Sequence, residues 1–218
     1  MSFSPGLPKK DSEPQPSGGE RKLATNTMQN TTPSLPDRVH TARLTLRPFA
    51  LGDIDDIMLY ATDERWSRFL PVPQPYTRAD GITFLELQAK ADTITAPRWA
   101  IEYEGKVVGG INIRFESGFA RGVMGYSIAP AVWGKGLTTE AARRIVDLSF
   151  ESLSQLEEVA ADANSLNTAS LKVMEKLGMR RVGVSQQQRP KHEGLVDIVT
   201  CSLSREEWLA SRAAPAAG

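Results

Sequence analysis

A glycine–lysine–glycine turn between a predicted strand and a predicted helix constrains this sequence more than any other stretch. It lies in "IAPAVWGKGLTTEAAR" (residues 128–143), where Gly134 and Gly136 flank Lys135. The first amides of a helix are unpaired and lie at the positive end of the helix dipole, so such a turn suits an anion such as phosphate. The alternative that the glycines leave open is a tight turn without a ligand.

Two common phosphate-binding motifs do not match this turn. A Walker loop requires glycine at the place of Ala129 and serine or threonine at the place of Gly136. A Rossmann fingerprint requires a third glycine at the place of Thr139, within a nucleotide-binding unit that the flanking sequence lacks. The turn therefore belongs to another architecture.

The composition narrows the class of protein. The 218 residues suffice for one domain, and 26 basic residues balance 26 acidic ones, so no overall field favours nucleic acid or an anionic membrane. The single cysteine, Cys201, excludes an intrachain disulfide framework. Because the sequence has neither a long apolar run nor the apolar core of a signal peptide, we expect a cytoplasmic protein without a membrane partner. We expect no nucleic-acid partner and no metal either.

The composition changes once along the chain. Residues 1–38 hold six of the 14 prolines and show neither helical nor strand periodicity, so we expect a disordered tail. From Val39, "VHTARLTLRPF" alternates apolar and polar residues, which predicts the first strand. We expect one domain over residues 39–210 and a second disordered tail over residues 211–218.

Strand and helix patterns follow in this domain. A helix with Asp53 as its N-cap is expected first, and a second begins at Thr77, whose spacing to Asp80 is that of a capping box. The side chains expected to face the core from these helices are those of Ile54, Ile57, Met58, Ala61, Ile82, Leu85 and Ala89. A meander of strands, two strand–helix units and a closing helix with a capping box from Ser204 to Glu207 come next. The fold class is α/β (α+β): a mixed, mostly antiparallel central sheet with helices on both faces.

Four segments in order resemble one known family. "GYSIAPAVWGKGLTTEA" is similar to the acetyl-CoA-binding segment of the Gcn5-related N-acetyltransferases (GNAT), in particular of the ribosomal-protein N-terminal acetyltransferases of the RimJ/RimL type. "NSLNTASLKVMEKLGM", "RFLPVPQPYT" and "GLVDIVTCSLSREEW" resemble further segments of that branch. The resemblance covers about Val39 to Trp208 and implies the GNAT fold.

The resemblance implies acetyl-CoA as co-substrate. Its pyrophosphate would lie on the backbone amides of Val132 through Leu137, and its pantetheine arm on a strand edge exposed by a splay near Pro130. The resemblance leaves two readings for each of three side chains. Lys135 lies along a phosphate or is a solvated surface lysine, and Trp133 covers the cofactor or packs on the loop. Glu140 touches the substrate or offsets the helix dipole. Ala131 departs from the family pattern, which has Gln or Arg there. The residues implied to bind the cofactor are Ile128, Ala129, Val132, Trp133, Gly134, Lys135, Gly136, Leu137, Thr138, Asn167 and Ser170.

The resemblance also implies that Ser170 donates a hydrogen bond to the departing coenzyme sulfur or relays a proton to it through water. The alternative is that Ser170 only forms a local hydrogen bond at the start of its helix. Cys201 is expected to be a buried structural thiol rather than a nucleophile. The acidic residue that family members often carry before the fourth strand's glycine–tyrosine pair is replaced by Val123. Other base candidates, each with a solvated-surface alternative, are Glu102, Glu116, His192 and Glu193, and ordered water is a further one. Trp66 and Tyr126 are expected to be walls of the acceptor pocket or core residues.

The function that follows is acetyl transfer from acetyl-CoA to a primary amine by direct attack. The acceptor suggested by the nearest branch is a protein N-terminal α-amine, and the alternative is a small amine such as an antibiotic or a polyamine. A non-catalytic acyl-CoA-binding module and an interaction domain without coenzyme are the two alternatives from other classes. A homodimer is implied by the family resemblance alone.

Overall fold

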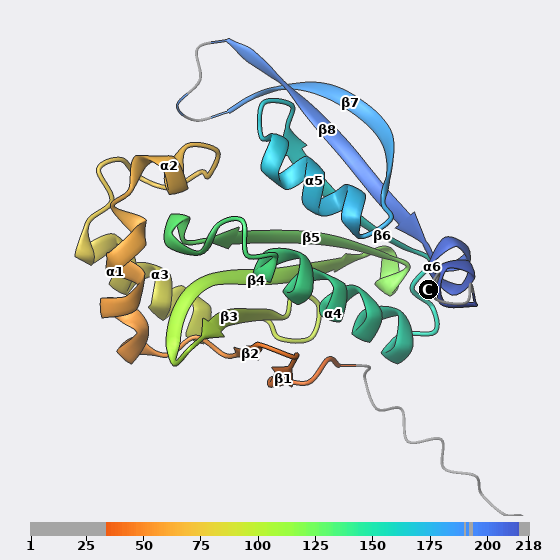
Figure 1. The fold of residues 1–218 in the computed structure, drawn as a ribbon, viewed down its shortest axis with the longest axis horizontal. Helices are drawn as coiled ribbons and strands as arrows, with labels where there is room; N and C mark the ends of the chain where they lie inside the picture. Colours follow the sequence, from red (N-terminus) through yellow and green to blue (C-terminus); the bar gives the residue numbers. More distant parts are fainter. Residues whose placement is uncertain (1–33, 190, 192–193, 214–218) are drawn as a thin grey trace, which may run out of the picture. The chain divides into compact units, whose positions relative to one another are not determined.

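The computed structural model describes residues 34–189, 191 and 194–213, which form an eight-stranded sheet with helices on both faces (Figure 1). The strand order is β1-β2-β3-β4-β5-β6-β8-β7, and neighbours are antiparallel except β5 and β6, which run parallel. The expected mixed, mostly antiparallel sheet is confirmed. The strands are β1 (Val39–His40), β2 (Leu44–Arg47), β3 (Arg98–Tyr103), β4 (Lys106–Glu116), β5 (Arg121–Ile128), β6 (Glu158–Asn164), β7 (Arg180–Gln188) and β8 (Leu195–Ser204).

Six α-helices and three 3-10 turns accompany the described strands, and all but the last helix lie between strands. The helices are α1 (Ile54–Ala61), α2 (Glu64–Ser67), α3 (Arg78–Ala89), α4 (Leu137–Ser152), α5 (Thr168–Lys176) and α6 (Arg205–Ala213). The 3-10 turns are η1 (Leu51–Asp53), η2 (Ser117–Phe119) and η3 (Pro130–Val132). None of the helices in these ranges is both long and apolar enough to cross a membrane.

The two faces of the sheet carry different helices. Phe49, which packs edge-on against Phe84 of α3, lies so close to Gly110 of β4 that a Cβ there would be 2.9 Å from its ring. On the other face Tyr126 of β5 reaches Ser170 of α5, and Figure 1 shows α5 beside α4. Because side chains alternate along a strand, the position of each strand residue assigns it to one face. We call these the α3 face and the α5 face.

The predicted first strand is in fact a short hairpin. Residues 39–40 and 44–47 form two strands that pair with each other, because the chain reverses at Thr41. The Thr41 amide and its hydroxyl both bond to Leu44, which closes this turn locally. Apolar alternation alone did not reveal the reversal, since Val39 and Leu44 are both buried on either side of it.

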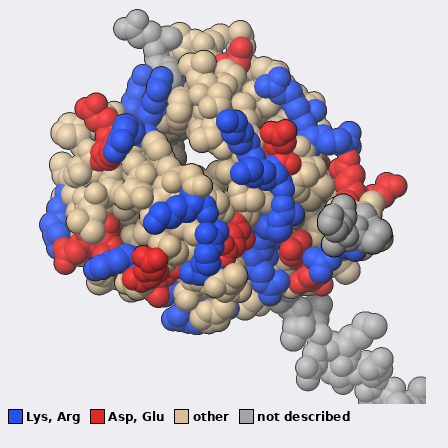
Figure 2. All heavy atoms as spheres, viewed as in Figure 1, with Lys and Arg blue, Asp and Glu red and all other residues tan. Residues whose placement is uncertain are grey.

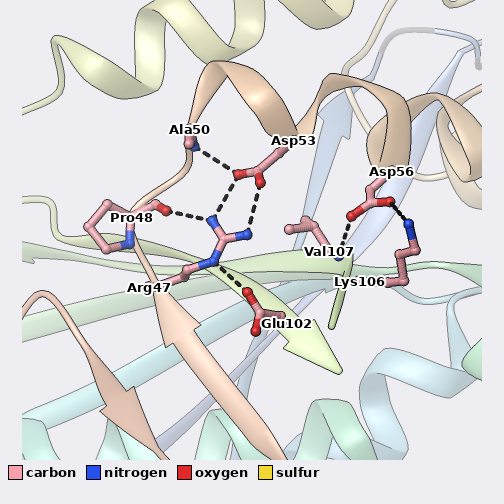
Figure 3. Close-up of polar contacts among 8 residues, drawn as sticks. All are labelled: Arg47, Pro48, Ala50, Asp53, Asp56, Glu102, Lys106 and Val107. Atoms are coloured by element: carbon pink, nitrogen blue, oxygen red, sulfur yellow. Dashed lines mark hydrogen bonds and ion pairs between the residues drawn. The ribbon is translucent and has the colours of Figure 1, made fainter. Parts of the chain in front are cut away.

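Asp53 does not cap α1 with its side chain as expected. Its carboxylate accepts hydrogen bonds from the Ala50 amide at 2.8 Å and from two guanidinium nitrogens of Arg47 at 2.8 and 3.0 Å (Figure 3). Arg47 also donates to Glu102 at 2.6 Å. Asp53, which the sequence predicted as a helix cap, thus forms a largely buried ion pair with Arg47. Because Arg47 also pairs with Glu102, this cluster joins η1 to β2 and β3.

The second helix begins as predicted. Thr77 accepts from the Asp80 amide, and Asp80 accepts from the Thr77 amide, so the capping box is confirmed. The expected inward face is only partly right: Leu85 is buried, whereas Ile82 and Ala89 are exposed. One turn before Leu85 it is Gly81 that lies inward. A side chain at this position would come too close to Ile54.

The described residues include parts of both segments expected as tails. Leu35 is buried, and the Trp99 indole Nε1 donates to the Pro36 carbonyl oxygen at 3.0 Å, so residues 34–38 pack on the domain. At the other end α6 continues to Ala213, and its capping box from Ser204 to Glu207 is confirmed. The rest of the two expected tails, residues 1–33 and 214–218, lies outside the described residues.

Candidate active site

A cavity of about 480 Å³ opens where β5 and β6 separate, and Figure 2 shows a hollow through this part of the molecule. The parallel pairing of these strands ends with Met124 and Ala161. Beyond that point β5 continues to Ile128 bonded to β4 alone. The expected splay is present, but it begins at Gly125 rather than near Pro130, because β6 stays paired with β8 as it diverges from β5.

The glycine turn at the end of β5 leaves a run of backbone donors free. Gly134 and Gly136 have φ of +78° and +77°, a left-handed conformation that a residue with a Cβ rarely adopts. A Cβ on Gly134 would meet nothing within 4 Å, so backbone conformation rather than space requires glycine there. Within the described residues the amides from Gly134 to Thr139 have no acceptor, which fits a bound anion at the start of α4.

The loop is held in place by the β1–β2 turn. Arg43 donates to the Lys135 carbonyl oxygen at 3.0 Å, and its Nε donates to Glu140 in the first turn of α4 at 2.7 Å. The Thr41 hydroxyl donates to Glu140 at 2.6 Å. Burial alone would raise the pKa of Glu140, but the hydrogen bonds from Thr41 and Arg43 outweigh it and lower that pKa. Glu140 is therefore an ionised brace beside the loop.

The two large side chains of the loop have partners within the protein. The Trp133 ring is half exposed, and its Nε1 donates to the carbonyl oxygen of Ile128 at 3.0 Å. The Lys135 ammonium lies 5.3 Å from the centre of the Tyr103 ring, a cation–π distance. The Ala129 amide donates to Val108 of β4 at 2.7 Å, which fixes the entry to the loop.

Other expected cofactor residues occupy the start of α4. The side chain of Leu137 is almost fully buried and anchors the first turn, with Thr138 beside it half-buried. Val132, in η3, is buried below the loop. These side chains face the core or the helix surface, so the backbone is what this segment offers to a ligand.

Ser170 and Tyr126 form a hydroxyl pair in the cavity wall. Their oxygens lie 3.0 Å apart, and the Tyr126 hydroxyl also lies 3.2 Å from the Ser170 carbonyl oxygen. A phenol has one proton, so if Tyr126 donates to that carbonyl, then Ser170 donates to Tyr126; if Tyr126 donates to Ser170, the serine proton is free for another acceptor. Burial raises the pKa of Tyr126 to about 12, which keeps this proton in place at neutral pH.

Asn167 caps the helix that carries Ser170. Its side-chain oxygen accepts from the Ser170 amide at 3.2 Å, and both residues line the cavity. The helix-start role considered from the sequence is thus present, and it places the Ser170 hydroxyl at the cavity wall.

Three of the residues expected at the acceptor pocket lie elsewhere. Glu102 is bound to Arg47 (Figure 3), and Glu116 is bound to Arg114 and Arg121. Trp66 packs edge-on against Tyr60 and Tyr76. None of the three lines the cavity, whereas Tyr126 does. His192 and Glu193 lie outside the described residues.

The cavity brings together polar residues that the sequence analysis did not single out. Asp162 interrupts the buried strand β6 with a carboxylate, a signal that the sequence carried but that strand periodicity treats as a solvated position. The other such polar residues in the cavity lining are Gln88, Arg98, Asn112, Ser127, Asn164 and Arg189. They come from segments far apart in the chain, so no spacing pattern connects them.

The lone cysteine takes no part in this site. Cys201 of β8 is buried and does not line the cavity, and burial raises the pKa of its thiol. A neutral, buried thiol is a poor nucleophile. Among the described residues no cluster of three or more His, Cys, Asp or Glu side chains could hold a metal ion.

Comparison with known proteins identifies the family. Residues 43–180 match the family model described as "Acetyltransferase (GNAT) domain". An uncharacterized N-acetyltransferase, p20 of Bacillus licheniformis, is 28% identical over 182 residues, which cover 79% of this chain and 98% of p20. A GNAT-family acetyltransferase from Bacillus anthracis superposes with a TM-score of 0.68 at 25% identity, over 78% of this chain and 99% of that one.

A more distant solved structure shares the fold. Mycobacterium smegmatis RimJ in complex with CoA-disulfide superposes with a TM-score of 0.64 at 19% identity, over 78% of this chain and 89% of that one. The match to the family model, which spans more than half of the sequence, agrees with the sheet order and the splayed strands. The chain belongs to the GNAT family of acetyltransferases.

Proposed function

We propose that this protein transfers acetyl from acetyl-CoA to the α-amine of a protein N-terminus. The observation that supports the proposal is the edge of β5 from Gly125 to Ile128, which has no partner strand within the described residues and runs from the cavity to a loop of free amides. Along this edge the Ile128 carbonyl oxygen accepts from the Trp133 indole. An extended pantetheine arm is the kind of ligand that pairs with such an edge, and a pyrophosphate is the kind of anion that such a loop accepts.

The reaction needs no covalent intermediate on the protein. The neutral amine attacks the thioester carbonyl carbon, the carbon–sulfur bond breaks, and the sulfur leaves as a thiolate while the amine nitrogen loses a proton. In this proposal Ser170 donates a hydrogen bond to the developing negative charge, and Tyr126 donates in turn to Ser170. The pKa of Tyr126, about 12, is well above that of a thiol, about 8.5, so the pair stabilises the thiolate and water supplies its proton.

An α-amine suits the polar residues of the cavity. Its ordinary pKa is about 8, compared with about 10.4 for a lysine side chain, so a useful fraction is neutral near pH 7. The carboxylate of Asp162 is available to take up the proton or to hold the ammonium form. A polyamine is a weaker candidate, because Arg98 and Arg189 also line the cavity and would repel a second positive charge.

Calorimetric titration with acetyl-CoA, CoA and ATP tests the coenzyme assignment. We expect the two CoA ligands to bind and ATP to be silent, and we expect Gly134→Val with Gly136→Val to weaken binding by roughly tenfold or more, because each valine strains a left-handed residue. Gly178→Val is the matched control, since Gly178 also has a positive φ but follows α5. Unchanged affinity in the folded double variant contradicts the assignment.

Acetylation of short peptides with free N-termini tests the acceptor. We expect mass spectrometry to find one acetyl group on the α-amine, and none on peptides whose α-amine is blocked. Turnover of spermidine or aminoglycosides without turnover of any peptide would replace the proposed acceptor with a small amine. Coenzyme binding without turnover of any amine would instead indicate the non-catalytic module.

A further inference from the structure

Three charged residues line the cavity without ion-pair partners in the described part of the chain. They are Arg98 at the start of β3, Asp162 in β6 and Arg189 just after β7, and within the described residues none of them lies in an ion pair. Many other arginines of the described chain pair with a carboxylate, Arg47 and Arg114 among them. A charge left unpaired at a cavity wall is available to a ligand.

Arg98 and Asp162 lie in one row across the α3 face. Arg98 pairs in register with Asn112, and Asn112 pairs with Gly125. Because Met124 pairs with Ala161 in the parallel ladder, Asp162 stands level with Gly125, at the first position of the splay. Three strand spacings separate the backbones of Arg98 and Asp162, which is at least about 14 Å.

The middle of this row is open and polar. Gly125 has no side chain, and a Cβ there would lie 3.0 Å from the Asn112 side-chain oxygen. The side-chain amide of Asn112, a residue of the cavity lining, has no hydrogen-bond partner within the described residues. At the far end one oxygen of Asp162 accepts from the Thr200 hydroxyl at 2.6 Å, a neutral partner that leaves the negative charge in place. A ligand that lies along the row therefore meets a cation at one end, an amide in the middle and a carboxylate at the other.

Arg98 is oriented by contacts that leave part of its guanidinium free. Its Nε donates to the Ala96 carbonyl oxygen at 3.2 Å, and its Nη1 donates to the side-chain oxygen of Gln88 at 3.2 Å. Gln88 is itself fixed by a bond to the Phe84 carbonyl oxygen. These two partners are neutral, and the nearby Asp92 carboxylate forms no ion pair with Arg98, although the charge of Arg98 contributes to lowering the pKa of Asp92. The remaining N–H groups of Arg98 form a fork suited to a carboxylate.

We propose that the acceptor is a peptide N-terminus with an acidic side chain at its first or second residue. The α-amine lies at the splay beside Asp162, and the acidic side chain lies against Arg98, with Arg189 adding positive charge on the same side. This inference deepens the proposed function and rests on it. It specifies which N-termini are substrates, because an amide or a basic side chain at that place would leave Arg98 unpaired or repel it.

Peptides that differ in one side chain test the proposal. The set carries Asp, Asn, Glu, Gln or Lys at the first or second position, and kcat/KM is measured for each. We expect acidic peptides to exceed their amide isosteres by roughly 10- to 100-fold, the range for one charge-assisted hydrogen bond, and Lys peptides to be the poorest. Equal kcat/KM for acidic and amide peptides overturns the proposal.

Variants identify the residue responsible. Arg98→Gln should collapse the ratio of acidic to amide peptides towards one, and Arg98→Lys should restore part of it, because the charge returns without the fork. Arg114→Gln, at an arginine outside the cavity, is the matched control and should keep the full ratio. A preference that survives in the folded Arg98→Gln variant overturns the assignment to Arg98.

A second variant separates the two ends of the row. Asp162→Asn should lower kcat/KM for acidic and amide peptides alike, since it acts on the amine that all of them share. If no peptide reacts but free acidic amines such as glutamate do, with a rate that Arg98→Gln abolishes, the protein-acceptor proposal fails and the recognition of an anionic amine stands. If no acidic amine of either kind binds or reacts, the recognition itself is refuted.

Discussion

At the scale of single residues, the Ser170–Tyr126 pair is the part of the site that the proposed mechanism places closest to the chemistry. The two hydroxyl oxygens are 3.0 Å apart, on α5 and β5, and they meet where those elements border the splay. The Asn167 cap sets the start of α5 and so the height of Ser170 along the cavity wall. The position of the Ser170 hydroxyl therefore depends on the helix cap at Asn167 and on the register of β5.

We predict that Ser170→Ala lowers kcat by roughly 100-fold while the Kd for acetyl-CoA changes by less than about threefold, because the lost hydrogen bond serves the departing sulfur rather than the bound coenzyme. Stopped-flow rates with saturating substrates and calorimetric titration measure the two quantities. Tyr126→Phe keeps the ring and removes only the hydroxyl that supports Ser170, so its effect should be smaller. A wild-type kcat in the Ser170→Ala variant removes the serine from the mechanism.

A second residue-scale feature is the largely buried charge on Arg47. It donates to Asp53 and to Glu102, and Figure 3 shows all three side chains directed towards one another between β2, η1 and β3. The hydrogen bond to Asp53 raises the pKa of Arg47, so this cation is charged at every pH of interest. The next residues are Pro48 and Phe49, and Phe49 lines the cavity, so the cluster also holds one wall of the site.

We predict that Arg47→Met lowers the free energy of unfolding by about 3 kcal/mol, because it leaves two carboxylates without their shared partner. Urea denaturation measures the change. Arg78→Met is the matched control: the Arg78–Asp55 pair is exposed, at 56% and 80% of the side-chain surfaces, and its loss should cost about 0.5 kcal/mol or less. Equal losses in both variants would show that burial does not set the contribution of the Arg47 cluster.

At the scale of elements, the contact between the β1–β2 turn and the start of α4 links a structural hairpin to the glycine loop. Glu140 accepts from Thr41 and from Arg43, and Arg43 also donates to the Lys135 carbonyl oxygen. The hairpin is more than 90 residues from the loop in sequence. The orientation of the free amides thus depends on an element that is distant from them in sequence.

We predict that Glu140→Gln lowers the free energy of unfolding by about 1–2 kcal/mol at pH 7. Because the folded-state pKa of Glu140 lies below its ordinary value of 4.5, this stabilisation is full above about pH 4.5 and is lost as the pH falls through the lowered pKa. Denaturation of both proteins from pH 7 to pH 3 measures it. Glu175→Gln, at an exposed position of α5, should show no such pH-dependent difference. A gap between Glu140→Gln and the wild type that widens at low pH would have the wrong sign.

At the scale of the whole molecule, the first described residues, 34–38, pack on the core of the domain. Leu35 lies in the core, and the Pro36 carbonyl oxygen satisfies the indole of Trp99, which is itself almost fully buried. The domain therefore needs residues that composition alone assigns to a tail.

We predict that a chain beginning at Val39 is less stable than one beginning at Ser34 by about 3 kcal/mol, the sum of one buried leucine and one hydrogen bond to a buried donor. Thermal and urea denaturation of the two truncated chains measure the difference. Leu35→Ala in the longer chain should account for more than half of it. Equal stabilities would show that residues 34–38 add nothing to the domain.

The sequence by itself determined the features that local chemistry controls. The capping boxes at Thr77 and Ser204 depend on contacts across three residues, and the left-handed glycines at Gly134 and Gly136 depend on the backbone alone. The order of strand and helix patterns, together with four similar segments, was enough to predict the fold and the family. Such features can be predicted from the sequence because the interacting residues are close together in the chain.

Only the tertiary structure decided which side chains share the cavity and which do not. Glu102 was expected to be available as a base, but the fold places Arg47 beside it. Asp162 was not among the expected site residues, and this exposed side chain lines the cavity because β5 and β6 part at its position. The row from Arg98 to Asp162 combines strands β3 to β6. Charge pairing and sheet register act between segments distant in sequence, so they are fixed by the folded chain and leave no pattern in its spacing.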